Sequence, residues 1–132
     1  MATRNDIVKE AKQWIDTVWR HQGRNARGID CAGLIVVVGH KNEVMNYDCK
    51  DYPRNTCRDH FISHFDKFAD KKPLKDRQHG DIILFRDGIY ACHCGILDVN
   101  ERGEEFIVHS YHVRRKCVRE KITDLFTSKI PQ

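Results

Sequence analysis

The stretch GIDCAGLIVVVG, residues 28–39, sets Cys31 between an aspartate and an unbroken apolar run. The run is apolar on every side, so it forms a buried helix or a buried strand, and its Val and Ile residues alone favour a strand. The cysteine favours the helix, because a helix N-terminus lowers the pKa of a thiol and its unpaired N–H groups can form part of an oxyanion hole. Gly28 and Gly33 would let other backbone approach closely. We therefore expect a buried helix that begins at Cys31, with this cysteine as a candidate nucleophile.

The size and composition of the chain indicate a single domain over residues 1–132 with one continuous core. Its 40% hydrophobic and 32% charged residues are typical of a soluble globular protein. No apolar run approaches the roughly 18 residues that a membrane-spanning helix needs, so we expect no membrane span. The N-terminus lacks the pattern of a secretory signal, so we expect synthesis in the cytoplasm without a signal peptide.

The charge balance is mildly basic, because 23 Lys and Arg residues stand against 19 Asp and Glu residues. Such a surface favours anionic partners without selecting one. The basic residues are scattered, with no stripe of interleaved aromatics, so we expect no nucleic-acid partner. The six cysteines, in a chain without a signal peptide, are expected to be reduced, and most of them to be small buried hydrophobes.

The pattern of apolar residues predicts an α+β fold, with helices first and an antiparallel sheet second. Thr3 and Asp6 form a capping-box pattern at the start of a helix over about 4–20. A polar, glycine-broken loop at 20–28, a loop at 47–55 and a turn at 75–80 are also expected. A third amphipathic helix carries Phe61, Phe65 and Phe68. In the second half the period changes to that of strands, over residues 81–86, 90–97, 105–111 and 115–120, with a short helix at 122–129.

Cysteine chemistry also needs a base and a group that orients the base. In the strand at 90–97, alternation places His93 and Gly95 on one face and Cys92, Cys94 and Ile96 on the other. A hairpin would bring His109 of the next strand alongside His93, where it could fix the tautomer of the first ring. Considered singly, these residues are more often a core cysteine and two structural histidines, and the residues alone leave both interpretations open.

The sequence resembles the NlpC-type cell-wall peptidases, a papain-like superfamily, and in particular their phage-tail-associated branch. The matching segments occur in the order of the family and cover nearly the whole chain. The combination of Asp-Cys-x-Gly-Leu, Gly-Asp and His-x-Gly-Ile is more specific than any one of these elements. The segments are WRHQGR (19–24), GIDCAGL (28–34), YPRN (52–55), HGDIILF (79–85), HCGIL (93–97) and FIVHS (106–110).

The resemblance implies that Cys31 is the nucleophile, His93 the general base and acid, and His109 the residue that orients it. It also implies a papain-like core, in which the cysteine helix packs on an antiparallel sheet of about four to six strands. Asp30 would help to bind the free amine of the substrate, and it also suits a helix N-terminus in its own right. Asp81 is expected to organise a turn rather than to take part in catalysis.

The implied reaction is hydrolysis of amide bonds in peptidoglycan stem peptides, often the D-glutamyl–diaminopimelate bond, without a cofactor or a metal. The implied partners are the stem peptide and the proteins of a phage tail, and the implied location is a virion that acts at the bacterial cell wall. Two positions depart from the family. Trp19 stands where a tyrosine is common and Ala32 where a serine is common, and Gln22 is a substitute oxyanion donor. These departures bear on substrate detail more than on the reaction class.

Three other functions are compatible with the sequence. A metal-binding module would use the run CHC at 92–94 together with Cys49, Cys57 and His60. These residues lack C-x-x-C spacing, and strand alternation points His93 away from its two neighbouring cysteines. A catalytically retired tail-assembly or binding module with the same fold is favoured by Trp19 and Ala32. An acyltransferase would resolve the thioester with an amine or alcohol, but relatives with that activity place the histidine before the cysteine. We predict a cysteine peptidase.

Overall fold

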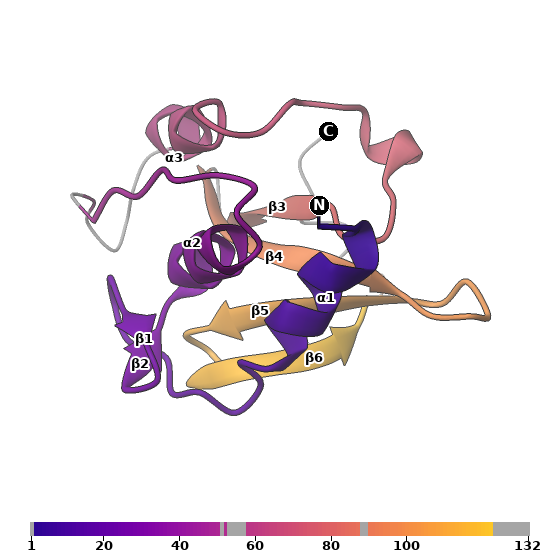
Figure 1. Ribbon diagram of the computed structural model, residues 1–132. Coiled ribbons are helices and arrows are strands. Elements are labelled where there is room, and N and C mark those ends of the chain that lie inside the picture. Colours follow the sequence, from indigo (N-terminus) through magenta and orange to yellow (C-terminus); the bar gives the residue numbers. More distant parts are fainter. Residues whose placement is uncertain (1, 51, 53–57, 88–89, 123–132) are drawn as a thin grey trace.

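The computed structural model of the protein describes residues 2–50, 52, 58–87 and 90–122. Helices cover one face of a four-stranded antiparallel sheet, and a two-stranded hairpin lies beside them (Figure 1). This arrangement confirms the predicted α+β class. The elements are α1 (Arg4–Lys12), β1 (Arg24–Asn25), β2 (Gly28–Ile29), α2 (Cys31–Lys41), α3 (Arg58–Phe65), the 3₁₀ turn η1 (Leu74–Asp76), β3 (Ile82–Asp87), β4 (Tyr90–Val99), β5 (Glu105–Tyr111) and β6 (Lys116–Lys121).

The sheet is a meander in the order β3-β4-β5-β6, and every neighbouring pair is antiparallel. All four predicted strands are present. The turn between β4 and β5 is organised by Asn100, whose Oδ1 accepts the N–H groups of Arg102 and Glu104 at 3.0 and 2.9 Å, while Gly103 takes a φ of +80°. Short connections of this kind bring consecutive strands side by side, so residues 16 positions apart can meet across them.

Both faces of the sheet are buried, and the alternation of β4 assigns its side chains to them. Cys94 and Ile96 point toward α1 and α2, where Leu34 of α2 also contributes to the core. Leu97 points the other way and packs with Ile107 of β5. The predicted separation of Cys94 and Ile96 from the face of His93 is therefore confirmed, because these residues follow the two-residue period of a strand.

The first helix starts as predicted but ends earlier. Thr3 and Asp6 form the expected capping box, with the Thr3 side chain accepting from the Asp6 N–H and the Asp6 side chain accepting from the Thr3 N–H. The expected end near residue 20 is wrong, since α1 stops at Lys12 and Asp16 takes a φ of +76°. Val18 and Trp19 then form bridges to Lys116 and Ile29 (the latter in β2), so tertiary pairing overrides the helical spacing.

Two other expected segments differ in detail. The loop at 20–28 includes the short hairpin of β1 and β2, in which Arg24 pairs with Ile29. The third helix, α3, ends at Phe65, and Phe68 lies in the turn that follows, with its ring centroid 5.7 Å from that of Phe65. Of the predicted helix at 122–129, Ile122 is irregular, and the rest lies outside the described residues.

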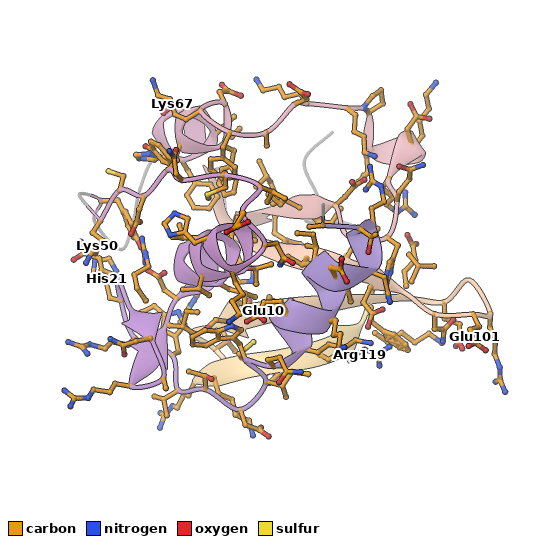
Figure 2. The ribbon with its side chains drawn as sticks, viewed as in Figure 1. Glu10, His21, Lys50, Lys67, Glu101 and Arg119 are labelled. Atoms are coloured by element: carbon orange, nitrogen blue, oxygen red, sulfur yellow. The ribbon has the colours of Figure 1, made fainter. Side chains whose placement is uncertain are left out.

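Two carboxylates, Asp98 and Asp81, fasten α1 to the sheet and to the turn before it. Asp98 of β4 accepts ion pairs from Lys12 of α1 at 3.0 Å and from Arg119 of β6 at 2.6 Å; Arg119 is labelled in Figure 2. Asp81 accepts the Gln78 N–H at 2.7 Å and pairs with Arg4 of α1, so it organises the turn before β3 as expected. In the described part of the chain, no helix is long and apolar enough to cross a membrane.

Gly33 is the glycine of α2 at which the structure leaves no room for a side chain. A Cβ atom there would lie 2.1 Å from the carbonyl oxygen of Gly23, which is backbone and cannot turn away. We expect Gly33→Ala to lower the free energy of unfolding by about 2–3 kcal/mol, in the range of overpacked sites. Urea unfolding followed by circular dichroism measures this change.

Gly39→Ala is the matched control in the same helix. Its added Cβ would meet the Met45 side chain at 2.8 Å, and a flexible methionine can move. We expect a much smaller loss for this variant, because alanine also has the better helix propensity. Equal stability of the two variants would contradict the close approach of Gly23 to α2.

Candidate active site

The first helical residue of α2 is Cys31, which is half-buried, and the residue before it caps the helix. Asp30 is the N-cap, and its Oδ1 accepts the N–H of Gly33 at 2.7 Å. A side-chain oxygen at this position satisfies one of the unpaired N–H groups of the first turn. The predicted position of the cysteine at a helix N-terminus is therefore confirmed, together with the capping role that Asp30 suits.

The carboxylate of Asp30 also joins two loops to the start of this helix. Its Oδ2 accepts the backbone N–H of Gln22 at 2.7 Å and the hydroxyl of Tyr52 at 2.6 Å, and its Oδ1 pairs with Arg24 at 3.1 Å. Each oxygen therefore has two protein donors, and the residue is 4% exposed. Burial, and then the neighbouring carboxylate, raise the pKa of Tyr52, which keeps its hydroxyl protonated as a donor.

The network of Asp30 extends outward through Arg24. The guanidinium donates to Asp48 Oδ1 at 3.1 Å and to the carbonyl of Cys49 at 3.2 Å, and it lies 5.6 Å from the ring centroid of Tyr52. The ring of His21 meets the same tyrosine edge-on at 5.6 Å. His21 is labelled in Figure 2 on this side of the molecule. The two loops thus meet around one buried carboxylate beside Cys31.

The two predicted histidines form a direct pair on neighbouring strands. Nε2 of His93 lies 2.7 Å from Nδ1 of His109, and the two side chains are almost fully buried. The rings of Phe85 and Tyr111 flank the pair, with centroids 5.5 and 4.6 Å from that of His93. The predicted approach of the two imidazoles across the β4–β5 hairpin is confirmed.

A β-bulge lies next to His93. Phe85 pairs with His93, but Arg86 pairs with Ala91, so β4 has one more residue than β3 at this step. A bulge interrupts the pleat and turns a neighbouring side chain in a new direction, and bulges are frequent beside active sites. The register of β4 thus changes at the residue that carries the candidate base.

Glu120 is a member of the site that sequence analysis did not find. Its Oε2 lies 2.8 Å from Nε2 of His109, and its Oε1 accepts from Nε of Arg114 at 2.7 Å. The signal was weak, because Glu120 is the last residue of the predicted strand 115–120 and stands between two other charged residues, Arg119 and Lys121. Val118 is the residue that pairs with His109, and Glu120 lies two positions further along β6. Only this register brings the Glu120 carboxylate to the imidazole.

Burial sets the charge of His109. It lowers the pKa of this histidine below the ordinary value of 6.5, and this effect exceeds the opposing attraction of Glu120. His109 is therefore a neutral imidazole at neutral pH. Its contact with Glu120 is then a hydrogen bond from the ring N–H to the carboxylate, not an ion pair.

Two contacts join the cysteine segment to the histidine strands. The thiol of Cys94, the residue after His93, hydrogen-bonds with Cys31; burial first, and then this contact, raise the pKa of Cys94. The hydroxyl of Ser110, the residue after His109, donates to the carbonyl of Ile29 at 2.5 Å. The start of α2 is thus fastened to β4 and β5 at the residues adjacent to the histidine pair.

The remaining predicted site residues lie at the border of this centre. Gln22 has a φ of +61°, and its side-chain amide donates to the carbonyl of Tyr52 at 2.9 Å. Trp19 forms a parallel bridge with Ile29, which places its backbone beside the cysteine segment. Its ring meets that of His112 edge-on, with centroids 6.1 Å apart. Gln22 thus joins the Asp30 network, while the Trp19 ring packs toward the turn after β5.

Among the side chains that the structure describes, no three histidines, cysteines or acids gather as metal ligands. The side chains of Cys57, His60 and Cys92, which belong to the metal-binding alternative, lie outside that set. The metal-binding module therefore stays an untested prediction.

The comparison with protein families identifies the domain. The model of the NlpC/P60 family matches residues 16–129, which include every residue of the site described above. The chain belongs to the NlpC/P60 family. No curated protein sequence matches it.

Solved structures share the fold of this NlpC/P60 domain. The NlpC/p60 domain of the peptidoglycan hydrolase SagA matches with a TM-score of 0.64 and 15% identity, over 91% of this chain and 90% of that one. An NlpC/P60 family protein from Bacillus cereus ATCC 10987 matches with a TM-score of 0.68 and 15% identity. That match covers 98% of this chain and 38% of the other, so this chain spans less than half of its length. The papain-like fold expected from the sequence motifs is confirmed.

The neutral state of His109 predicts a pH dependence of stability. Its pKa is lowered in the folded protein, so the unfolded chain binds the proton more tightly, and the free energy of unfolding falls as the pH falls below about 6.5. His109→Gln removes this titration. Urea unfolding of both proteins between about pH 8 and pH 5 should show a loss for the wild type that the variant lacks. Parallel curves would contradict the assignment.

Proposed function

We propose that this NlpC/P60 domain is a cysteine peptidase that hydrolyses amide bonds in peptidoglycan stem peptides. The observation that carries the proposal is the 2.7 Å contact between His93 and His109, on strands fastened to the helix that begins at Cys31. A nucleophile, a base and a group that orients the base are the minimum for thiol catalysis, and we assign these roles to Cys31, His93 and His109.

In the proposed acylation step, Nδ1 of His93 takes the proton of Cys31, because its Nε2 is engaged by His109. The thiolate attacks the carbonyl carbon of the substrate, and the carbonyl oxygen becomes an oxyanion. The Gly33 N–H is used by Asp30, so the N–H groups of Cys31 and Ala32 at the start of α2 are the candidate oxyanion donors. Collapse breaks the C–N bond, and His93 returns its proton to the leaving amine.

In the proposed deacylation step, water attacks the resulting thioester of Cys31. His93 accepts a proton from the water, a second oxyanion forms and collapses, and the thiolate leaves. The products are a carboxylic acid and the free thiol, so one water molecule is consumed for each bond broken. His109 keeps the ring of His93 in position during both steps.

The residues around the cysteine would shape the substrate site. The resemblance implies that Asp30 binds the free amine of the stem peptide, but its two oxygens already have four protein donors. We propose that Asp30 acts by holding the loops of Gln22 and Tyr52 in place, and that these loops and Trp19 line the substrate. The resemblance to the phage-tail-associated branch adds a tail particle at the cell wall as the proposed location.

A catalytically retired domain with the same fold is the second candidate. Trp19 and Ala32 favour it, because a tyrosine hydroxyl and a serine hydroxyl are common at these positions in the family and both are missing here. The intact trio of Cys31, His93 and His109 favours the enzyme. The two candidates differ in one property, the cleavage of stem peptides.

Incubation of the purified protein with defined stem peptides and muropeptides, followed by mass spectrometry, tests the proposal. We expect the wild type to release fragments cut at one amide bond, and Cys31→Ala to lose at least about 10³-fold of this rate, because the nucleophile is gone. His93→Ala should show a loss of similar order, since the base acts with the nucleophile as a unit.

Cys117→Ala is the matched control among the cysteines. Burial raises the pKa of Cys117 to about 12, so its thiol does not supply a nucleophile, and we expect the rate per folded molecule to be unchanged. A wild type that is folded but cuts no fragment would favour the retired domain. Equal loss in Cys31→Ala and Cys117→Ala would refute the role of Cys31.

A further inference from the structure

We propose that Glu120 is a positioning residue that sets the tautomers of both site histidines. The inference rests on the proposed function, because it assigns the proton positions that a base at His93 requires. Glu120 lies on β6, one strand beyond His109 and two beyond His93. It completes a row of hydrogen bonds that crosses three strands.

The proton positions follow from the two contacts. A carboxylate only accepts hydrogen bonds, so the 2.8 Å contact with Glu120 places the proton of His109 on Nε2. A neutral imidazole carries one proton, so Nδ1 of His109 is an acceptor. The 2.7 Å contact with His93 must then be a donation from Nε2–H of His93. Nδ1 of His93 is left without a proton, which is the state that a base for Cys31 needs.

The environment of His109 makes this assignment firm. The residue is completely buried between the pair partner His93 and the carboxylate of Glu120, with Tyr111 stacked at a centroid distance of 5.1 Å. In such surroundings the neutral form is favoured, and an imidazole ring with two partners has one consistent tautomer. The Glu120 carboxylate can only accept a hydrogen bond, so it determines which nitrogen of His109 carries the proton.

Glu120 is held in place from its other side. Arg114, in the turn between β5 and β6, donates from Nε to Oε1 at 2.7 Å, so each carboxylate oxygen has its own donor. The backbone at this point is fixed by the β5–β6 ladder, in which Glu120 pairs with Ile107. The groups that face the carboxylate are therefore His109 from β5 and Arg114 from the turn, one neutral and one positive.

The removal of Glu120 would allow the opposite row of tautomers. His109 could then carry its proton on Nδ1 and donate to Nε2 of His93, which would place the proton of His93 on Nδ1. In the proposed mechanism this ring would then present an N–H to Cys31 instead of a lone pair, and it could not accept the thiol proton. The wrong tautomer lowers kcat and has no direct effect on the substrate contacts that set KM.

The test compares Glu120→Ala and Glu120→Gln with a neighbouring control. We expect Glu120→Ala to lose about 10–100-fold in kcat with little change in KM, as is typical for a group that orients a catalytic imidazole. Glu120→Gln should recover much of this loss, because its amide oxygen still accepts from Nε2–H of His109. Lys121 lies next to Glu120 on β6, and Lys121→Ala removes an exposed ion pair with Glu104. This control variant should keep the wild-type kcat.

Nitrogen-15 NMR of the imidazole rings supplies a readout that does not depend on turnover. The wild type should show protonated Nε2 in both His93 and His109 and unprotonated Nδ1 in His109, and Glu120→Ala should lose this pattern. An unchanged tautomer pattern or a wild-type kcat in Glu120→Ala would overturn the proposal, as would equal losses in the Ala and Gln variants. If the wild type cut no stem peptide but showed the expected tautomers, the proposed function would fail while the role of Glu120 in fixing tautomers stood.

Discussion

The buried carboxylate of Asp30 is the contact on which the geometry of this domain depends. It caps α2, accepts from the loop of Gln22 and from Tyr52, and pairs with Arg24. Removing one partner from a buried ionic network of this kind costs about 3–5 kcal/mol, because a charge is left without compensation. Cys31 is the next residue along the chain. The position of the cysteine is therefore set by its neighbour and by two loops, one that precedes it and one that carries Tyr52.

The two histidines, in contrast, are positioned by the regular antiparallel pairing of β4, β5 and β6. The β4–β5 hairpin places His93 beside His109, and the β5–β6 register adds Glu120. Cys94 and Ser110 then join these strands to Cys31 and Ile29. An irregular, ionic part of the fold and a regular, hydrogen-bonded part are thus joined at the start of α2.

Much of the fold could be predicted from local patterns. The capping box at Thr3, the helix at Cys31 and the four strands each follow from residue types that agree with their environment. The end of α1 could not be predicted, because Trp14 and Val18 continue the helical spacing. The bridge partner of Val18 is Lys116, far away in the sequence, and that of Trp19 is Ile29. Tertiary pairing of this kind leaves no local signal.

The helix start at Cys31 and the pairing of His93 with His109 could be predicted, because motif residues and strand alternation indicate them. The site was less predictable where the role depends on register or on loop contacts. Glu120 becomes a partner of His109 only through the pairing of β5 and β6, and the burial of Asp30 by four donors depends on loops that one sequence does not define. A charged residue in a strand or loop is most often solvated, so neither role stands out.

The most direct test of the central claim is the rate at which limiting iodoacetamide alkylates Cys31 as a function of pH, with the modified cysteine mapped by mass spectrometry. If the histidine row and the start of α2 act on one thiol, Cys31 should react selectively and remain reactive near pH 6, where an ordinary thiol carries little thiolate. His93→Ala should lose that reactivity at low pH. A Cys31 no more reactive than Cys49, the other half-buried cysteine that the structure describes, would contradict the account.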